Sequence, residues 1–67
     1  MINAGKLDGI SIGERVVYND RREGHTNIFA VVLEIHPHFM IVQFEDRADT
    51  TRINFSDRKW MDFLEAA

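Results

Sequence analysis

The residues of this chain that could do chemistry lie in two short polar segments. In the first, His36 and His38 flank Pro37, with Glu34 close by, and residues two apart in an extended segment point the same way. A zinc site needs three or four protein ligands, and no further residue stands in firm register with these. We therefore interpret the His-Pro-His segment as a turn and expect no metal site.

The second segment holds the carboxylates Glu45, Asp46 and Asp49. General acid–base catalysis by such groups needs a pocket that gives them different proton affinities, and a domain this small has no such pocket by default. The sequence also has no glycine-rich phosphate loop and no basic helix. We expect no catalytic residue, no cofactor and no small-molecule substrate, so enzyme activity is not predicted.

Composition indicates one small globular domain. The 67 residues are 45% hydrophobic and 28% charged, which suits a single modest core. Cysteine is absent, so stability must come from packing or association, and a cytoplasmic location is expected. The net charge of -3 creates no overall positive field. The longest apolar stretch, residues 28–33, is far shorter than the ~20 residues that span a bilayer, so no membrane partner is expected.

Two apolar runs, residues 27–35 and 39–46, predict a β-hairpin around Pro37 because they are rich in β-branched and aromatic residues. The first run is apolar on both faces, which suits a strand central to a small barrel or one that bends across two sheets. A bulge would let Ile35 change face. The two faces of this strand are formed by Ala30 and Val32 and by Phe29, Val31 and Leu33.

Further elements flank the hairpin. Residues 1–12 are expected to form a flexible arm whose Leu7, Ile10 and Ile12 cover part of the core. A first strand follows Gly13, a polar loop spans residues 19–26, and the alternation in residues 50–55 predicts a fourth strand. The domain proper is therefore residues 13–67.

The C-terminal segment allows two interpretations. Ser56 with Asp57 can cap a short helix over about residues 57–65, on which Trp60, Phe63 and Leu64 form an apolar stripe. The alternative is a 3₁₀ turn over residues 56–59 followed by a fifth strand over residues 60–64. We expect the helix.

The positions Gly13-x-x-Val16-x-Tyr18, Ala30-x-Val32 and Val42-x-Phe44-x-Asp46 together resemble the small Src-homology-3-like (SH3-like) barrel in its Tudor-type form. The resemblance covers residues 13–55. It implies a small antiparallel barrel of four to five strands. Together with the short C-terminal helix expected from residues 57–65, this predicts a mostly β fold.

Tudor-type barrels hold methylated cations in an aromatic cage at one end of the barrel. The resemblance places Tyr18 and Phe44 at cage positions and Asp46 as an acidic partner, but Ile28 and Arg47 stand where further aromatics are expected. A guanidinium in the wall would repel a cation, which argues against binding of methyl-lysine or methyl-arginine.

The same end of the expected barrel offers a second chemistry. Its two loops would gather Arg21, Arg22 and Arg47 around Tyr18, with Phe29 nearby, and arginines with aromatics can contact phosphates and stack on unpaired bases. Acidic residues in the same loops would largely cancel this field. The simpler interpretation makes the loop charges solvated and the rings part of the core. The candidate binding residues are Tyr18, Arg21, Arg22, Phe29, Phe44, Asp46 and Arg47.

The predicted function is a non-catalytic binding or adaptor module that contacts a protein partner or a second copy of itself. This prediction depends on the acidic net charge and on the second apolar face of the hairpin, which one short helix would not cover completely. The alternative is a nucleic-acid-binding barrel in which Arg52 joins the loop arginines, and its affinity would fall steeply with salt.

Overall fold

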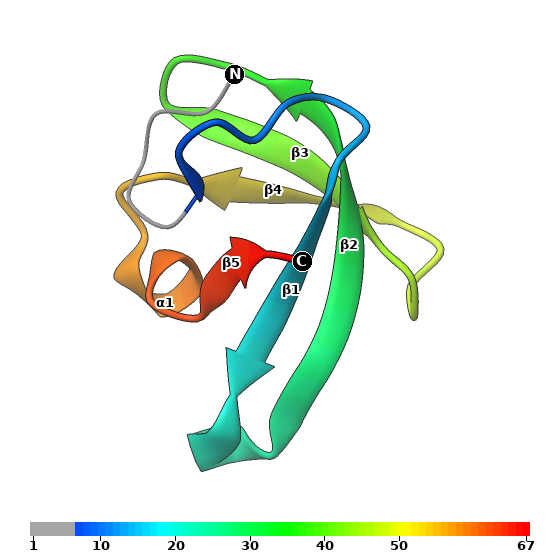
Figure 1. Ribbon diagram of the computed structural model, residues 1–67, viewed down its shortest axis with the longest axis vertical. Coiled ribbons are helices and arrows are strands. Elements are labelled where there is room, and N and C mark those ends of the chain that lie inside the picture. Colours follow the sequence, from blue (N-terminus) through cyan, green and yellow to red (C-terminus); the bar gives the residue numbers. More distant parts are fainter. Residues whose placement is uncertain (1–6) are drawn as a thin grey trace.

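The computed structural model describes residues 7–67, which form a five-stranded antiparallel sheet with strand order β4-β3-β2-β1-β5 (Figure 1). A single 3₁₀ turn, η2, joins β1 to β2, and a short helix, α1, stands between the last two strands. The elements are β1 Arg15–Asp20, η2 Arg21–Glu23, β2 His25–Ile35, β3 Phe39–Phe44, β4 Thr50–Asn54, α1 Arg58–Met61 and β5 Leu64–Ala66.

The hairpin of β2 and β3 is confirmed, and β2 is shared between two partners. Its first part pairs with β1, from Asp20↔His25 to Arg15↔Val31, and its last part pairs with β3, from Ala30↔Phe44 to Ile35↔Met40. A register shift between Val32 and Glu34 marks a bulge, after which Ile35 packs against the core together with Ala30 and Val32. The expected change of face at Ile35 is therefore present.

The C-terminal segment combines parts of both interpretations. The expected helix forms but ends at Met61, so the range 57–65 is wrong in its second half, and Asp57 rather than Ser56 is the N-cap, accepting from the Lys59 N–H. A fifth strand follows, but it begins at Leu64 rather than Trp60. The physical reason is the free edge of β1, which pairs Tyr18 with Leu64 while Asn19 N–H donates to Phe63 O at 3.0 Å.

Among the described residues, eleven buried hydrophobic side chains form one core cluster, to which the buried Val17 does not belong. Leu7 and Ile10 belong to it at 0% and 5% exposure, as expected for the N-terminal segment, whereas Ile12 is 63% exposed and does not. The expectation of a flexible arm also concerns residues 1–6, which lie outside the described residues. Half-buried side chains from the C-terminal third pack against this core: Phe55, Trp60, Met61 and Phe63.

The strand order leaves β4 and β5 at opposite edges of the sheet, so over residues 7–67 the sheet is open. Within the same residues no helix is long and apolar enough to cross a membrane.

Leu7 and Ile12 provide a matched test of how the N-terminal segment contributes to stability. We expect Leu7→Ala to lower the free energy of unfolding by about 2–5 kcal/mol because it removes a fully buried side chain. Ile12→Ala should change it by less than about 0.5 kcal/mol because that side chain is exposed. Urea denaturation followed by circular dichroism measures both values, and equal effects would show that the segment is not docked in solution.

Candidate functional site

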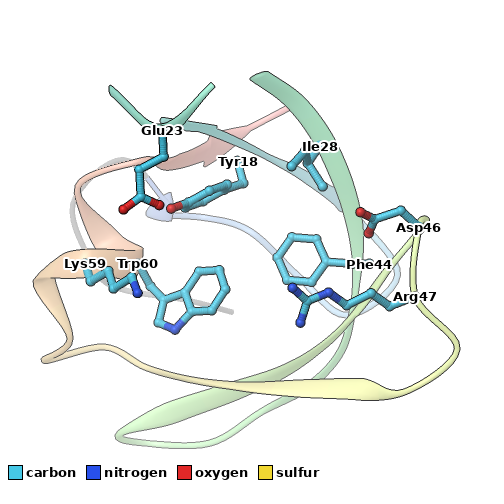
Figure 2. A pocket seen from close by; sticks show the side chains of 8 residues that line it. All are labelled: Tyr18, Glu23, Ile28, Phe44, Asp46, Arg47, Lys59 and Trp60. Atoms are coloured by element: carbon cyan, nitrogen blue, oxygen red, sulfur yellow. The ribbon is translucent and has the colours of Figure 1, made fainter. Parts of the chain in front are cut away.

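A pocket of about 290 Å³ opens beside the core, between the β1–β2 end of the sheet and α1 (Figure 2). Every strand from β1 to β3 contributes to it, and so do η2, α1 and the turn after β3. The residues that line it are Tyr18, Glu23, Ile28, Phe44, Asp46, Arg47, Lys59 and Trp60.

Three aromatic rings form the apolar part of the pocket. Trp60 lies 5.3 Å from Tyr18, tilted by 60°, and 5.8 Å from Phe44, stacked at 29° (centroid distances). Phe63 supports Tyr18 from behind, edge-on at 6.1 Å. Tyr18 and Phe44 are only 6% and 3% exposed, whereas Trp60 is half-buried. The first two rings are therefore the floor of the pocket, and the indole is a wall.

Local sequence explains how each ring reaches this place. Tyr18 alternates with Val16 on β1, and Phe44 alternates with Val42 on β3, so both rings share the buried face of the sheet. Trp60 comes from the other side, because the Asp57 cap starts α1 immediately after β4 and turns the chain over this end of the core.

The mouth of the pocket carries balanced charges. Figure 2 shows Glu23 and Lys59 on one side and Asp46 and Arg47 on the other, so each side has one acid and one base. The balance means that the pocket has little net attraction for an ion of either sign.

Asp20 is the only buried charged residue among those described, at 2% exposure. Its carboxylate caps η2 by accepting from the Arg22 N–H at 3.1 Å, and the Tyr18 hydroxyl lies 3.5 Å from its other oxygen. Burial raises the pKa of Tyr18 above its ordinary value of 10.0, and the negative charges of Asp20 and Glu23 raise it further.

The pocket gathers four of the seven candidate residues and not the other three. Tyr18, Phe44, Asp46 and Arg47 line it, together with Ile28. The remaining three candidates, Arg21, Arg22 and Phe29, do not.

Each of the other arginines considered for a nucleic-acid site is placed elsewhere. Arg22 lies over the Phe63 ring at 4.7 Å and pairs with Asp20 at 3.5 Å, while Arg21 is exposed in η2. Arg52 lies on the outer side of β4, stacked 3.8 Å from the centre of the Phe39 ring. These arginines do not form one basic cluster.

Phe29 belongs to the neighbourhood of the pocket rather than to its lining. It borders a second, shallower depression that shares Ile28 and Asp46 with the pocket. Its ring is covered by the guanidinium of Arg15 at 4.5 Å, and Arg15 is held there by Glu45 at 2.9 Å.

Sequence reasoning missed three residues of the site, Trp60, Glu23 and Lys59. The pattern places Trp60 in the stripe of a helix that seals the core, and this packing exists, but the position of α1 also brings the indole against Tyr18 and Phe44. No local signal in the sequence shows that contact, because it depends on where α1 packs relative to β1 and β3.

Nothing in the described part of the chain gathers three His, Asp or Glu side chains close enough to hold a metal ion. In the turn that follows β2, His36 Nε2 lies 2.9 Å from Glu34 Oε1, and the His36 ring stacks on Phe39 with the ring centres 4.3 Å apart.

No family model matches the sequence, and no curated protein or solved structure is significantly similar to it.

The raised pKa of Tyr18 gives a direct test of the pocket floor, because Tyr18 is the only tyrosine in the chain. We expect its phenolate absorbance to appear at a pH above 10.0, and later than in the urea-unfolded chain. The stabilisation from this group is complete below the unfolded pKa and is lost as pH rises through the folded pKa.

In Asp20→Asn the midpoint should fall towards the ordinary value, because one of the two negative charges that raise it is gone. An unchanged wild-type midpoint relative to the unfolded chain would contradict the burial of Tyr18.

Proposed function

We propose that this domain is a small SH3-like barrel of Tudor type, incompletely closed because its edge strands β4 and β5 do not pair, that acts as a non-catalytic protein-interaction module. Supporting this, every apolar residue of the pattern that carried the resemblance lies on the buried face: Val16, Tyr18, Ala30, Val32, Val42 and Phe44. The long β2 pairs with both β1 and β3 and has a bulge near its end. This pairing supports the expectation that the strand bends around the core.

The observation that carries the proposed function is the three-ring pocket with balanced charges at its mouth. Its volume of about 290 Å³ lies at the lower limit of small-molecule sites, which span roughly 300–1,000 Å³. A pocket of this size takes one side chain of a partner. Aromatic walls of this kind act as anchoring sites in protein interfaces.

The inserted side chain is uncharged. A cationic end would meet Arg47 and Lys59, and an anionic end would meet Glu23 and Asp46, so a charge of either sign is opposed at the mouth. An aliphatic or aromatic side chain gains the ring contacts without that cost.

The nucleic-acid alternative has one specific observation in its favour, namely that Arg47 and Lys59 flank rings on which a base could stack. Against it, Arg22 and Arg52 stack on other rings, and two acids share the mouth. We therefore favour the protein partner.

Trp60 and Phe55 allow a matched test, because both rings are half-buried against the core and only Trp60 lines the pocket. Peptides that lack tryptophan, selected on the domain from a random display library, should change the fluorescence of Trp60, which is the only tryptophan in the chain. By fluorescence polarisation of a labelled peptide, we expect Trp60→Leu to weaken binding more than about fivefold, as for an anchoring residue, and Phe55→Leu to have little effect.

Equal losses in the two variants would place the binding surface outside the pocket. A mixed single-stranded oligonucleotide serves as the competing probe. Tight binding that weakens steeply with salt would replace the protein-interaction proposal with the nucleic-acid one.

The charge balance predicts that Arg47 excludes cations. With N-acetyl-trimethyllysine amide as the probe, we expect Arg47→Gln to bind about two- to fivefold more tightly than the wild type. The reason is that Lys59 is then the only cationic side chain in the pocket lining, beside three rings and two carboxylates that attract the probe. Arg21→Gln changes the net charge equally from outside the pocket. Chemical-shift titration measures both, and an equal gain in the two variants would attribute the effect to overall charge.

A further inference from the structure

Two large hydrophobic side chains are exposed among the described residues, Ile12 at 63% and Leu33 at 40%. They are distant in the sequence, but backbone hydrogen bonds join the residues next to them. Gly13 N–H donates to Val32 O at 2.8 Å, and Val32 N–H donates to Glu14 O at 2.9 Å. Ile12 and Leu33 are therefore each one residue away from the bonded pair Gly13 and Val32.

A tight turn presents Ile12. The Glu14 N–H donates to Ser11 O at 3.1 Å, and Gly13, the third residue of this turn, has φ of 92°, as a type II turn requires. Gly13 and Glu14 both lie opposite Val32, which is a β-bulge with glycine in its first position. The turn fixes Ile12 at its tip, in contact with solvent.

A second bulge presents Leu33. In the ladder between β2 and β3, Val32 pairs with Val42 and Glu34 pairs with Ile41, so Leu33 is the extra residue. Bulges redirect side chains and commonly occur next to functional sites. Both bulges therefore lie next to one buried residue, Val32. Ile12 precedes the first bulge, Leu33 is the extra residue of the second, and both side chains are exposed.

The charges around this pair are acidic. Glu14 is exposed beside the turn, and the Glu34 side chain is 59% exposed beside Leu33. The nearest arginine in the sequence, Arg15, is held by Glu45 and lies over Phe29. The His36 Nε2 lies 2.9 Å from Glu34 Oε1.

We infer that Ile12 and Leu33 form a docking surface, separate from the aromatic pocket, for an apolar segment of another protein that carries lysine or arginine. The carboxylates of Glu14 and Glu34 complement the basic groups of that segment. A second copy of this chain fits less well, because a symmetric contact would set these acids against the same acids.

A test uses two 14-residue amphipathic peptides, one of leucine and lysine and one of leucine and glutamate, titrated into the isotope-labelled chain. We expect only the lysine peptide to shift the amides of Ile12, Gly13, Leu33 and Glu34. The double variant Ile12→Ser, Leu33→Thr keeps the net charge and changes only exposed side chains, so it should still fold. It should bind about tenfold more weakly, as expected when two partly exposed apolar side chains lose their burial.

Glu14→Gln and Glu34→Gln should each weaken binding by about 1.5- to 5-fold, as for an exposed ion pair, whereas Glu65→Gln, opposite Val17 on β5, should have a smaller effect. Undiminished binding by the double variant, or no binding at about 1 mM peptide, would overturn the inference. If the chain dimerises without peptide and the double variant is a monomer, the surface belongs to a second copy, which also overturns the inference. Neither result bears on the pocket, which Trp60 fluorescence reports separately.

Discussion

The fold depends on the backbone position of one buried valine. The Val32 side chain is 0% exposed, its amide and carbonyl bond to Glu14 and Gly13, and it stands opposite Val42 in the ladder to β3. One residue thus joins the start of the domain to the central hairpin. Because an unpaired buried backbone group is costly, this position fixes the register of both ladders at once. The two bulges on either side of it absorb the mismatch between a straight strand and a core that β2 must curve around.

The aromatic pocket follows from how a small core is closed at its two ends. Leu7 and Ile10 belong to the buried core cluster, and α1 brings Trp60 to Tyr18 and Phe44. A helix of four residues, which contributes Trp60 itself, is too short to fill the space over Tyr18 and Phe44, so a hollow remains beside the three rings. Three of the four charges at its mouth come from η2 and the turn after β3, and the fourth, Lys59, comes from α1.

The alternation of apolar residues correctly predicted the features that follow from the two-residue period of a strand. It located the hairpin and the fourth strand, and it placed Tyr18 and Phe44 on the buried face, because each such residue reports the same pleat. The same alternation places Arg52 on the opposite face of β4 from the buried Ile53, outside the core, so its absence from the pocket could have been predicted.

The end of α1 could not be predicted, because Trp60, Phe63 and Leu64 fit a helix and a strand equally over so few residues. The free edge of β1, a long-range feature, decides between them. The wall of the pocket formed by Trp60 could not be derived from local sequence, because it depends on where α1 packs.

The distribution of arginines over the aromatic rings explains why one site stands out. Three guanidinium groups lie over phenylalanine rings, Arg15 on Phe29, Arg22 on Phe63 and Arg52 on Phe39. Such stacking covers apolar ring surface while the charge stays in water. The pocket rings differ, because they pack on one another and none of these three arginines covers them. The rings of Phe29, Phe39 and Phe63 are therefore already covered from within the chain, whereas a group that enters the pocket contacts rings without displacing any of these three arginines.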